Sequence, residues 1–333
     1  MLRPIGRKQN GKREGKNFQD LIVWQKAHEF VIFKFMITKI FTFFLIFVSC
    51  YGSAEAGQRI LVIQSLRVAP YEEALAGFKS ACDAEIMQVV LSNQDKINPF
   101  QIIQADKPEL ILAIGMDALT KIKEIEDIPI VYMMVLNPQA ITFGEKNISG
   151  ISMTLSPEKQ ITTLLEVLPA AKRVGTLYNP DRTGNFIKGA VTAANNMGIS
   201  LLTEKVQNTK ELPSALKNIQ KKIDAFWMIP DITVYSPETI EFLLLFFLEN
   251  QKPIIAFSEK YVELGAVMSI SVDPLDIGKQ AGEMAKAILS NGGKRDIQRI
   301  DARKEVIAIN RKIAKKLGIT IDEKVLAKAK LLN

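Results

Sequence analysis

The chain has 333 residues, of which 47% are hydrophobic and 24% are charged, so a globular protein with two lobes is expected and a disordered or collagen-like chain is excluded. The formal net charge of +7 comes mostly from residues 1–56, which hold nine Lys or Arg and four Asp or Glu and leave 34 basic and 32 acidic residues in the remainder. Because that remainder is nearly neutral, its charge does not imply a polyanion-binding face, and no nucleic-acid partner is expected.

Histidine and cysteine are almost absent after residue 56. The only histidine, His28, and one of the two cysteines, Cys50, precede that point, and Cys82 is the single thiol that follows. Ser-His-Asp and Cys-His catalysis need an imidazole base, and zinc sites are built mainly from His and Cys. We therefore expect no enzyme, no catalytic residues, no metal and no cofactor, and a buried structural role for Cys82.

Residues 36–56 have the pattern of an export signal. Lys39 precedes a run of nine residues, Ile40–Val48, that is apolar except for Thr42, and an A-x-A cleavage sequence ends at Ala56. A membrane-spanning helix needs about twenty apolar residues, so this run is too short to span comfortably. Signal cleavage after Ala56 is the favoured interpretation; the alternatives are a lipid anchor on Cys50, which ends a degraded lipobox, and a retained anchor.

Residues 1–35 form a leader of doubtful origin. Asn17–Ile32 resembles the opening helix of small four-helix-bundle proteins encoded by insertions in bacterial ribosomal RNA genes. Since one helix cannot form a bundle core, we interpret the leader as a fusion scar or as the result of a start codon assigned too early, with Met36 as the expected start.

From Arg59 onward, short apolar runs alternate with helical segments. The first series has predicted strands over 59–65, 85–92, 110–115 and 128–135, and helices over 70–81 and 116–124. Uninterrupted apolar runs of this length are typical of strands buried in parallel sheets. The series predicts an α/β lobe with right-handed crossovers.

A second series starts with a strand over 148–154. Further strands are predicted over 173–178, 200–206, 225–229 and 253–257, with helices near 156–168, 184–197, 211–222 and 236–250. The chain then continues through a strand over 266–272, a helix over 275–290, a strand over 304–309 and a basic final helix over 310–319. No low-complexity linker separates the series, so we expect two closely connected α/β lobes.

Polar and aromatic residues stand at the carboxyl ends of these strands, where open parallel sheets bind their ligands. The candidate ligand-binding residues are therefore Ser65, Arg67, Tyr71, Gly115, Met116, Asn137, Tyr178, Asn179, Asp231 and Ser258. Neither G-x-G-x-x-G nor a P-loop sequence occurs, which disfavours a nucleotide site.

The loop over residues 65–71 offers a hydroxyl, a guanidinium and an aromatic ring just before a helix. Such a place suits a ligand carboxylate; the alternative is that Arg67 is merely exposed and Tyr71 packs against the helix. Gly115 would allow a ligand to approach the backbone closely. Asp231 follows a buried strand and is the best candidate partner for a ligand ammonium, the alternative being a capping or turn aspartate.

Five segments, in order, resemble the ABC-transporter substrate-binding proteins of the family that includes tryptophan- and tyrosine-binding lipoproteins. They are IPIVYMMVLNP (128–138), NISGISMT (147–154), LEVLPAAKRVGTLYNP (165–180), FWMIPD (226–231) and the run KPIIAFSEKYVELGAVMSISVDPLDIGKQAGEMAKAIL (252–289). The resemblance covers nearly all of residues 59–319. It implies the type I periplasmic-binding-protein fold, in which two Rossmann-like lobes with parallel sheets are joined by three crossover segments and close on a ligand.

The resemblance also implies lobe bounds. The first lobe is expected to comprise residues 57–153 plus 268–297, and the second 154–267 plus 298–333, with crossovers at 150–153, 268–271 and about 297–302. One departure is that many members have a His-Pro pair after the first strand, where this chain has Ala69 and Pro70. The ligand of the better-known members is therefore not assumed.

On this resemblance we expect a periplasmic, monomeric receptor that passes a small molecule, an amino acid or similar compound, to an ABC permease in the cytoplasmic membrane. For an amino acid, Ser65 and Arg67 would bind the carboxylate, Asp231 the ammonium, and Tyr71 with Tyr178 the side chain. The alternatives are a ligand-sensing receptor coupled to a signalling partner and, more remotely, a Rossmann-like enzyme.

Overall fold

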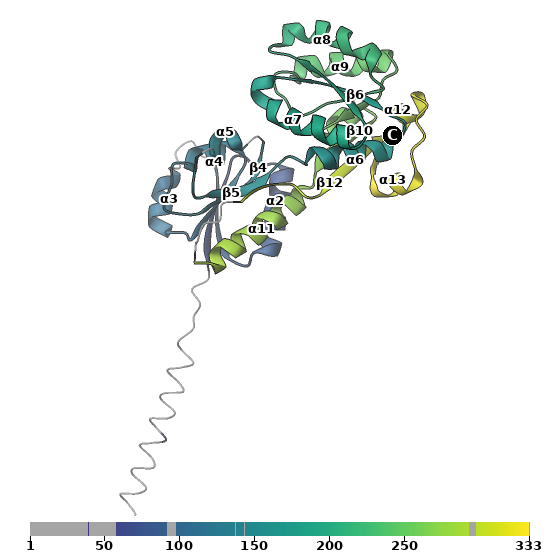
Figure 1. Ribbon diagram of the computed structural model, residues 1–333. Helices are drawn as coiled ribbons and strands as arrows, with labels where there is room; N and C mark the ends of the chain where they lie inside the picture. The colour runs from purple at the N-terminus through teal and green to yellow at the C-terminus, as the bar shows by residue number, and fades with distance from the viewer. Residues whose placement is uncertain are drawn as a thin grey trace, which may run out of the picture. The chain divides into compact units, whose positions relative to one another are not determined.

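The computed structural model describes residue 39 and residues 58–91, 98–136, 138–142, 144–292 and 298–332 (Figure 1). The unit described below is Gln58–Asn333. Apart from Lys39, the predicted leader and signal segment lie outside the described residues, as does Asn137. None of the described helices combines the length and the apolarity needed to cross a bilayer.

The first sheet has six parallel strands in the order β11-β5-β4-β3-β1-β2. These strands are β1 (Arg59–Gln64), β2 (Glu85–Val90), β3 (Leu110–Ile114), β4 (Ile130–Val135), β5 (Ile148–Ser152) and β11 (Arg299–Asp301). The accompanying helices are α2 (Ala69–Ala81), α3 (Pro99–Asp106), α4 (Met116–Ile122), α5 (Gln139–Thr142) and α11 (Pro274–Ser290). Every residue of β3 and β4 is buried, as the uninterrupted apolar runs predict.

The second sheet has seven strands in the order β13-β12-β10-β9-β8-β6-β7, parallel except where β12 meets β10. They are β6 (Arg173–Tyr178), β7 (Ser200–Lys205), β8 (Ala225–Trp227), β9 (Ile254–Ala256), β10 (Met268–Val272), β12 (Glu305–Asn310) and β13 (Lys330–Leu332). Its helices are α6 (Pro157–Val167), α7 (Pro180–Asn196), α8 (Leu212–Ile219), α9 (Pro237–Glu249), α10 (Glu259–Glu263), α12 (Arg311–Lys316) and α13 (Glu323–Lys328). Two mostly parallel α/β sheets confirm the predicted fold class.

The chain passes between the sheets three times, and two of the passages differ from the expected bounds. Strand β10 pairs with β9 and β12, so residues 268–272 belong to the second sheet, whereas the resemblance implied a crossover at 268–271 and a first lobe that resumes at residue 268. Strand β11 pairs with β5, so residues 299–301 belong to the first sheet although they were assigned to the second lobe. The bounds came from the resemblance, and the pairing of β11 with β5 joins segments about 150 residues apart, which the pattern of either segment alone does not predict.

Helices α2 and α11 cross in close contact on one face of the first sheet (Figure 1). A Cβ atom built on Gly278 of α11 would lie 1.8 Å from the carbonyl oxygen of Ala74 and 2.8 Å from the backbone nitrogen of Phe78. A Cβ on Gly77 of α2 would lie 2.0 Å from the Leu275 carbonyl oxygen. Because these glycines have no side chains, the backbones of α2 and α11 can touch. This contact holds α11, the helix that follows β10, against α2.

Strand β4 contains a β-bulge at its carboxyl end. Tyr132 is opposite Gly150 and Val135 is opposite Ser152, so two residues of β4 face one residue of β5. Within the bulge Met134 has a φ of 57°, a left-handed conformation that costs a non-glycine residue about 1–2 kcal/mol. Bulges of this kind change the direction in which a side chain points and are common next to functional sites.

Candidate ligand-binding site

A cavity of about 780 Å³ lies at the carboxyl ends of strands from both sheets. From the first sheet it is lined by Pro70, Tyr71, Met116, Met134, Leu136 and Met153; from the second it is lined by Asp181, Arg182, Pro230, Asp231, Ile232, Tyr235, Phe257 and Tyr261. Its volume falls within the range of about 300–1,000 Å³ that is typical of small-molecule sites. Its position is the one that the rule for open parallel sheets predicts.

The first-sheet wall is uncharged among the described residues and is formed largely by methionine and tyrosine. Burial, together with the charge of Asp117, raises the pKa of the Tyr71 phenol, which keeps it in the neutral form that can donate a hydrogen bond. Gly115 has a φ of 91°, and a Cβ there would lie 2.6 Å from Ser65 Oγ and 2.7 Å from the Tyr71 hydroxyl. The space that the sequence assigned to a closely approaching ligand is thus filled by these two side chains.

Ser65 and Arg67 are not placed as the sequence predicted. The Ser65 hydroxyl is buried and accepts a hydrogen bond of 2.9 Å from the Ala118 backbone N–H, so it caps the first turn of α4. The Arg67 side chain is 61% exposed, lies 3.6 Å from the Glu72 carboxylate and is not among the cavity-lining residues. The interpretation of Arg67 as a merely exposed residue therefore fits better, because its guanidinium lies beside the Glu72 carboxylate and does not line the cavity.

Asp231 is the buried charged group of the second-sheet wall, with 3% of its surface exposed. One carboxylate oxygen accepts hydrogen bonds from the Asn179 backbone N–H at 2.8 Å and from the Thr183 hydroxyl at 2.6 Å. The other accepts one from the Thr233 backbone N–H at 3.0 Å. Among the described residues, no basic side chain forms an ion pair with this carboxylate. Neutral donors thus hold a buried negative charge at the wall of the cavity.

Of the ten predicted site residues, Tyr71, Met116 and Asp231 line the same cavity. The buried side chain of Asn179 begins α7 by accepting a hydrogen bond of 2.9 Å from the Asp181 backbone N–H, so it positions this helix. Tyr178 is buried beside it, and Ser258 is the N-cap residue of α10; neither is among the lining residues.

An aromatic group at the second-sheet wall was not foreseen. The Phe257 ring lies 5.9 Å from the Tyr235 ring and 5.1 Å from the Tyr261 ring, centroid to centroid. Burial, together with the charge of Asp231, raises the pKa of the Tyr235 hydroxyl. The sequence did hold a signal, because Phe257 ends a predicted strand and Tyr261 follows one helical turn later.

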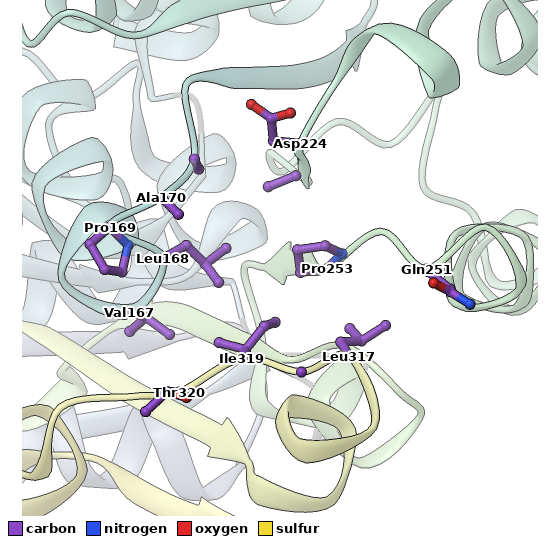
Figure 2. Close-up of a pocket in the computed structure, with 13 residues that line it drawn as sticks. Val167, Leu168, Pro169, Ala170, Asp224, Gln251, Pro253, Leu317, Ile319 and Thr320 are labelled. Carbon is purple, nitrogen blue, oxygen red and sulfur yellow. The ribbon is translucent and has the colours of Figure 1, made fainter.

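A second hollow, of about 420 Å³, lies at the opposite, amino-terminal edge of the second sheet (Figure 2). Its acidic residue, Asp224, directly precedes β8 and binds the Arg173 guanidinium at 2.7 Å. The same carboxylate accepts hydrogen bonds from the backbone N–H groups of Lys172 and Arg173. Since Asp224 already has a cationic partner in Arg173 and ligands bind at the other edge of such sheets, we take the first cavity as the candidate site.

Asp224 provides a prediction about stability. The hydrogen bond from Arg173 is the main cause that lowers the pKa of Asp224 to about 2, below its ordinary value of 3.8. A lowered folded-state pKa stabilises the fold above the unfolded-state value, and this stabilisation is lost as the pH falls from about 4 towards 2. We expect Asp224→Asn to lower the midpoint of thermal unfolding at pH 7. The decrease of this midpoint between pH 4 and pH 2 should be smaller in the variant than in the wild type. An unchanged pH profile would contradict the assignment.

Two α/β sheets that contribute their carboxyl edges to one ligand-sized cavity define a two-lobed solute-binding protein. A family model described as ABC transporter substrate binding protein matches residues 73–332, so the chain belongs to that family. Its members are solute-binding proteins rather than enzymes.

Several relatives and solved structures are similar to this chain. A tyrosine-binding protein of Clostridioides difficile (strain R20291) is 27% identical over 65% of this chain and 64% of its own length, slightly less than two thirds. An uncharacterized protein of Rickettsia prowazekii (strain Madrid E) is 29% identical over 65% of this chain and 69% of its own length. The ligand-free, open structure of a substrate-binding protein with adhesive properties from Clostridium difficile has a TM-score of 0.64 at 23% identity, covering 83% of this chain and 99% of its own. An ABC domain from Streptococcus, solved in complex with L-Trp, has a TM-score of 0.57 at 22% identity, covering 83% and 100%.

Proposed function

We propose that this protein is the solute receptor of an ABC importer and that it binds an L-amino acid in the cavity between the two sheets. The observation that carries the proposal is the buried Asp231 carboxylate, which lines a largely apolar and aromatic cavity and forms no ion pair with a basic side chain of the described residues. A buried charge is costly unless an opposite charge balances it, and a ligand ammonium would supply that charge. The tyrosine-binding relative and the L-Trp complex support an amino acid as the ligand class.

Arg182 is the residue that we assign to the ligand carboxylate. It is the one basic residue among the described residues that line the cavity. It lies in the first turn of α7, where the backbone N–H groups and the helix dipole favour an anion. Arg182 and Asp231 would thus bind the two charged groups of the ligand from the same sheet, in place of the predicted division between Arg67 and Asp231.

Arg182→Gln is expected to lower the affinity for the amino acid about 10- to 100-fold, because a hydrogen bond to a charged group contributes about 1.5–3 kcal/mol. Arg67→Gln is the matched control and should leave the affinity unchanged. Isothermal titration calorimetry with the amino acid and with its amide would measure both effects: the wild type should prefer the free carboxylate, and Arg182→Gln should lose this preference. Equal losses in the two variants would count against Arg182.

A thermal-shift series over the twenty L-amino acids tests the proposed function itself. A ligand that binds only the folded state stabilises it by about 2.7 kcal/mol when its concentration is 100 times the dissociation constant. At least one amino acid is expected to raise the unfolding midpoint, whereas D-enantiomers and the corresponding amines should raise it less. No shift with any amino acid would refute the ligand class.

The sequence before residue 58 supports an extracytoplasmic location, and membership of the substrate-binding family supports a permease partner. Its basic residue, short apolar run and A-x-A sequence fit export with release after Ala56, and Cys50 offers lipidation as the alternative. We propose that the exported receptor acts as a monomer. N-terminal sequencing of the exported product would distinguish a start at Gly57 from a lipidated Cys50.

A further inference from the structure

The β-bulge in β4 changes which side of the sheet Met134 faces. Up to the bulge, β4 alternates regularly: Val131 and Met133 pack into the core group that contains Phe78 of α2, and Tyr132 packs into the opposite group, which contains Leu119 of α4. The next residue, Met134, should return to the α4 side, but it lies on the same side as Met133, and Val135 takes the α4 side instead. The extra residue of the bulge is therefore Met134.

This placement directs Met134 to the cavity. The residue is only 3% exposed, has a φ of 57° and is one of the cavity-lining residues. A left-handed methionine near the carboxyl end of a buried strand is unfavourable for the backbone, and such conformations cluster at ligand sites where the surroundings enforce them. Glycine would adopt this φ without strain, yet the chain has a long apolar side chain at this position.

Met134 belongs to a cavity wall whose described lining side chains are all uncharged. Met116 and Met153 line the cavity from the neighbouring ends of β3 and β5, and Pro70, Tyr71 and Leu136 complete this side. Methionine is unbranched and polarisable, so it adapts to irregular apolar shapes and makes favourable contacts with aromatic rings. The charged lining residues are all on the side of the second sheet: Asp181 and Arg182 lie in α7, and Asp231 follows β8. A zwitterion held by the second sheet would therefore direct its side chain at the methionines.

We propose that Met134 is a specificity-determining residue, which forms the end of a subsite for a large, flat apolar side chain. The proposal rests on the proposed function, namely that this cavity binds an amino acid. Asp231 and Arg182 bind the ammonium and the carboxylate, which all amino acids share. Met134 contacts the side chain, in which amino acids differ. Phenylalanine should consequently be preferred to leucine, because a ring can make face and edge contacts with the thioether groups.

Two substitutions of Met134 separate specificity from folding. Met134→Gln keeps the length of the side chain but presents an amide to the ligand, which leaves a polar group unpaired in the subsite. Met134→Gly removes the side chain and suits the left-handed backbone, so it keeps the protein folded if the glutamine variant does not. Met87→Gln is the matched control, since Met87 on β2 is 44% exposed and does not line the cavity.

The readout is the ratio of the affinities for phenylalanine and leucine, measured by calorimetric titration or by competition against the tightest ligand. The wild type and Met87→Gln should favour phenylalanine at least tenfold, and both Met134 variants should reduce that ratio at least fivefold. An unchanged ratio, or an equal loss for both ligands, would overturn the role of Met134 while leaving the proposed function standing. A wild type that binds no amino acid would instead refute the proposed function, and this inference with it.

Discussion

Replacement of Asp231 by asparagine is expected to abolish most of the ligand affinity, lowering it at least 100-fold. Removing one partner of a buried charge pair costs about 3–5 kcal/mol, because the remaining charge stays buried without compensation. The folded protein should lose about 1–3 kcal/mol as well, since an amide cannot accept all three of the hydrogen bonds that Asn179, Thr183 and Thr233 donate to the carboxylate. Calorimetric titration measures the first effect and chemical unfolding the second.

Asp224→Asn is the matched control for this experiment. Asp224 and Asp231 flank the same strand, β8, and each accepts hydrogen bonds from backbone N–H groups, but Asp224 lies at the edge of the sheet that is far from the cavity. Its substitution should therefore destabilise the fold without changing the affinity. If both variants bind the amino acid as the wild type does, Asp231 is a structural turn aspartate and has no role in binding.

Gly278→Ala is expected to be the most destabilising small substitution outside the site, costing about 3 kcal/mol or more. The added methyl group would overlap the Ala74 carbonyl, whose oxygen lies 1.8 Å from the ideal Cβ position, and backbone atoms cannot rotate away as a side chain can. Helices α2 and α11 would have to separate, which exposes buried residues such as Phe78 and Ile277. The free energy of unfolding in urea measures the loss.

Gly189→Ala in α7 provides the comparison for Gly278. A Cβ atom there would meet only the Pro157 ring, at 3.7 Å, an ordinary contact. Because alanine is the better helix former, this substitution should leave the stability unchanged or raise it by up to about 1 kcal/mol. Equal stability of the two variants would mean that the α2–α11 contact is not as tight as described.

The strands of the fold could be predicted from the sequence because their signal is local. The runs that form β3 and β4 are apolar throughout, and their predicted ends agree with the structure to within two residues. The sheet that a strand joins could not be predicted in the same way. Strand β11 pairs with β5, about 150 residues earlier in the chain, and nothing in its three residues identifies that partner.

The candidate site could be predicted in part for a similar reason. Asp231, Tyr71 and Met116 follow strand ends, and the general rule for parallel sheets brings them to one cavity. Arg67 also follows a strand, but its direction depends on Glu72, a partner that the rule does not consider. Met134 could not be identified because the sequence IVYMMV contains no glycine or asparagine that would mark a left-handed residue.

The most direct test of the central claim is a crystal structure of the protein with the amino acid that gives the largest thermal shift. The account predicts that the ligand ammonium lies within hydrogen-bond distance of the Asp231 carboxylate, that the ligand carboxylate meets Arg182, and that the side chain rests against Met134. A ligand bound in the hollow beside Asp224, or one in the cavity whose ammonium leaves Asp231 unpaired, would contradict it.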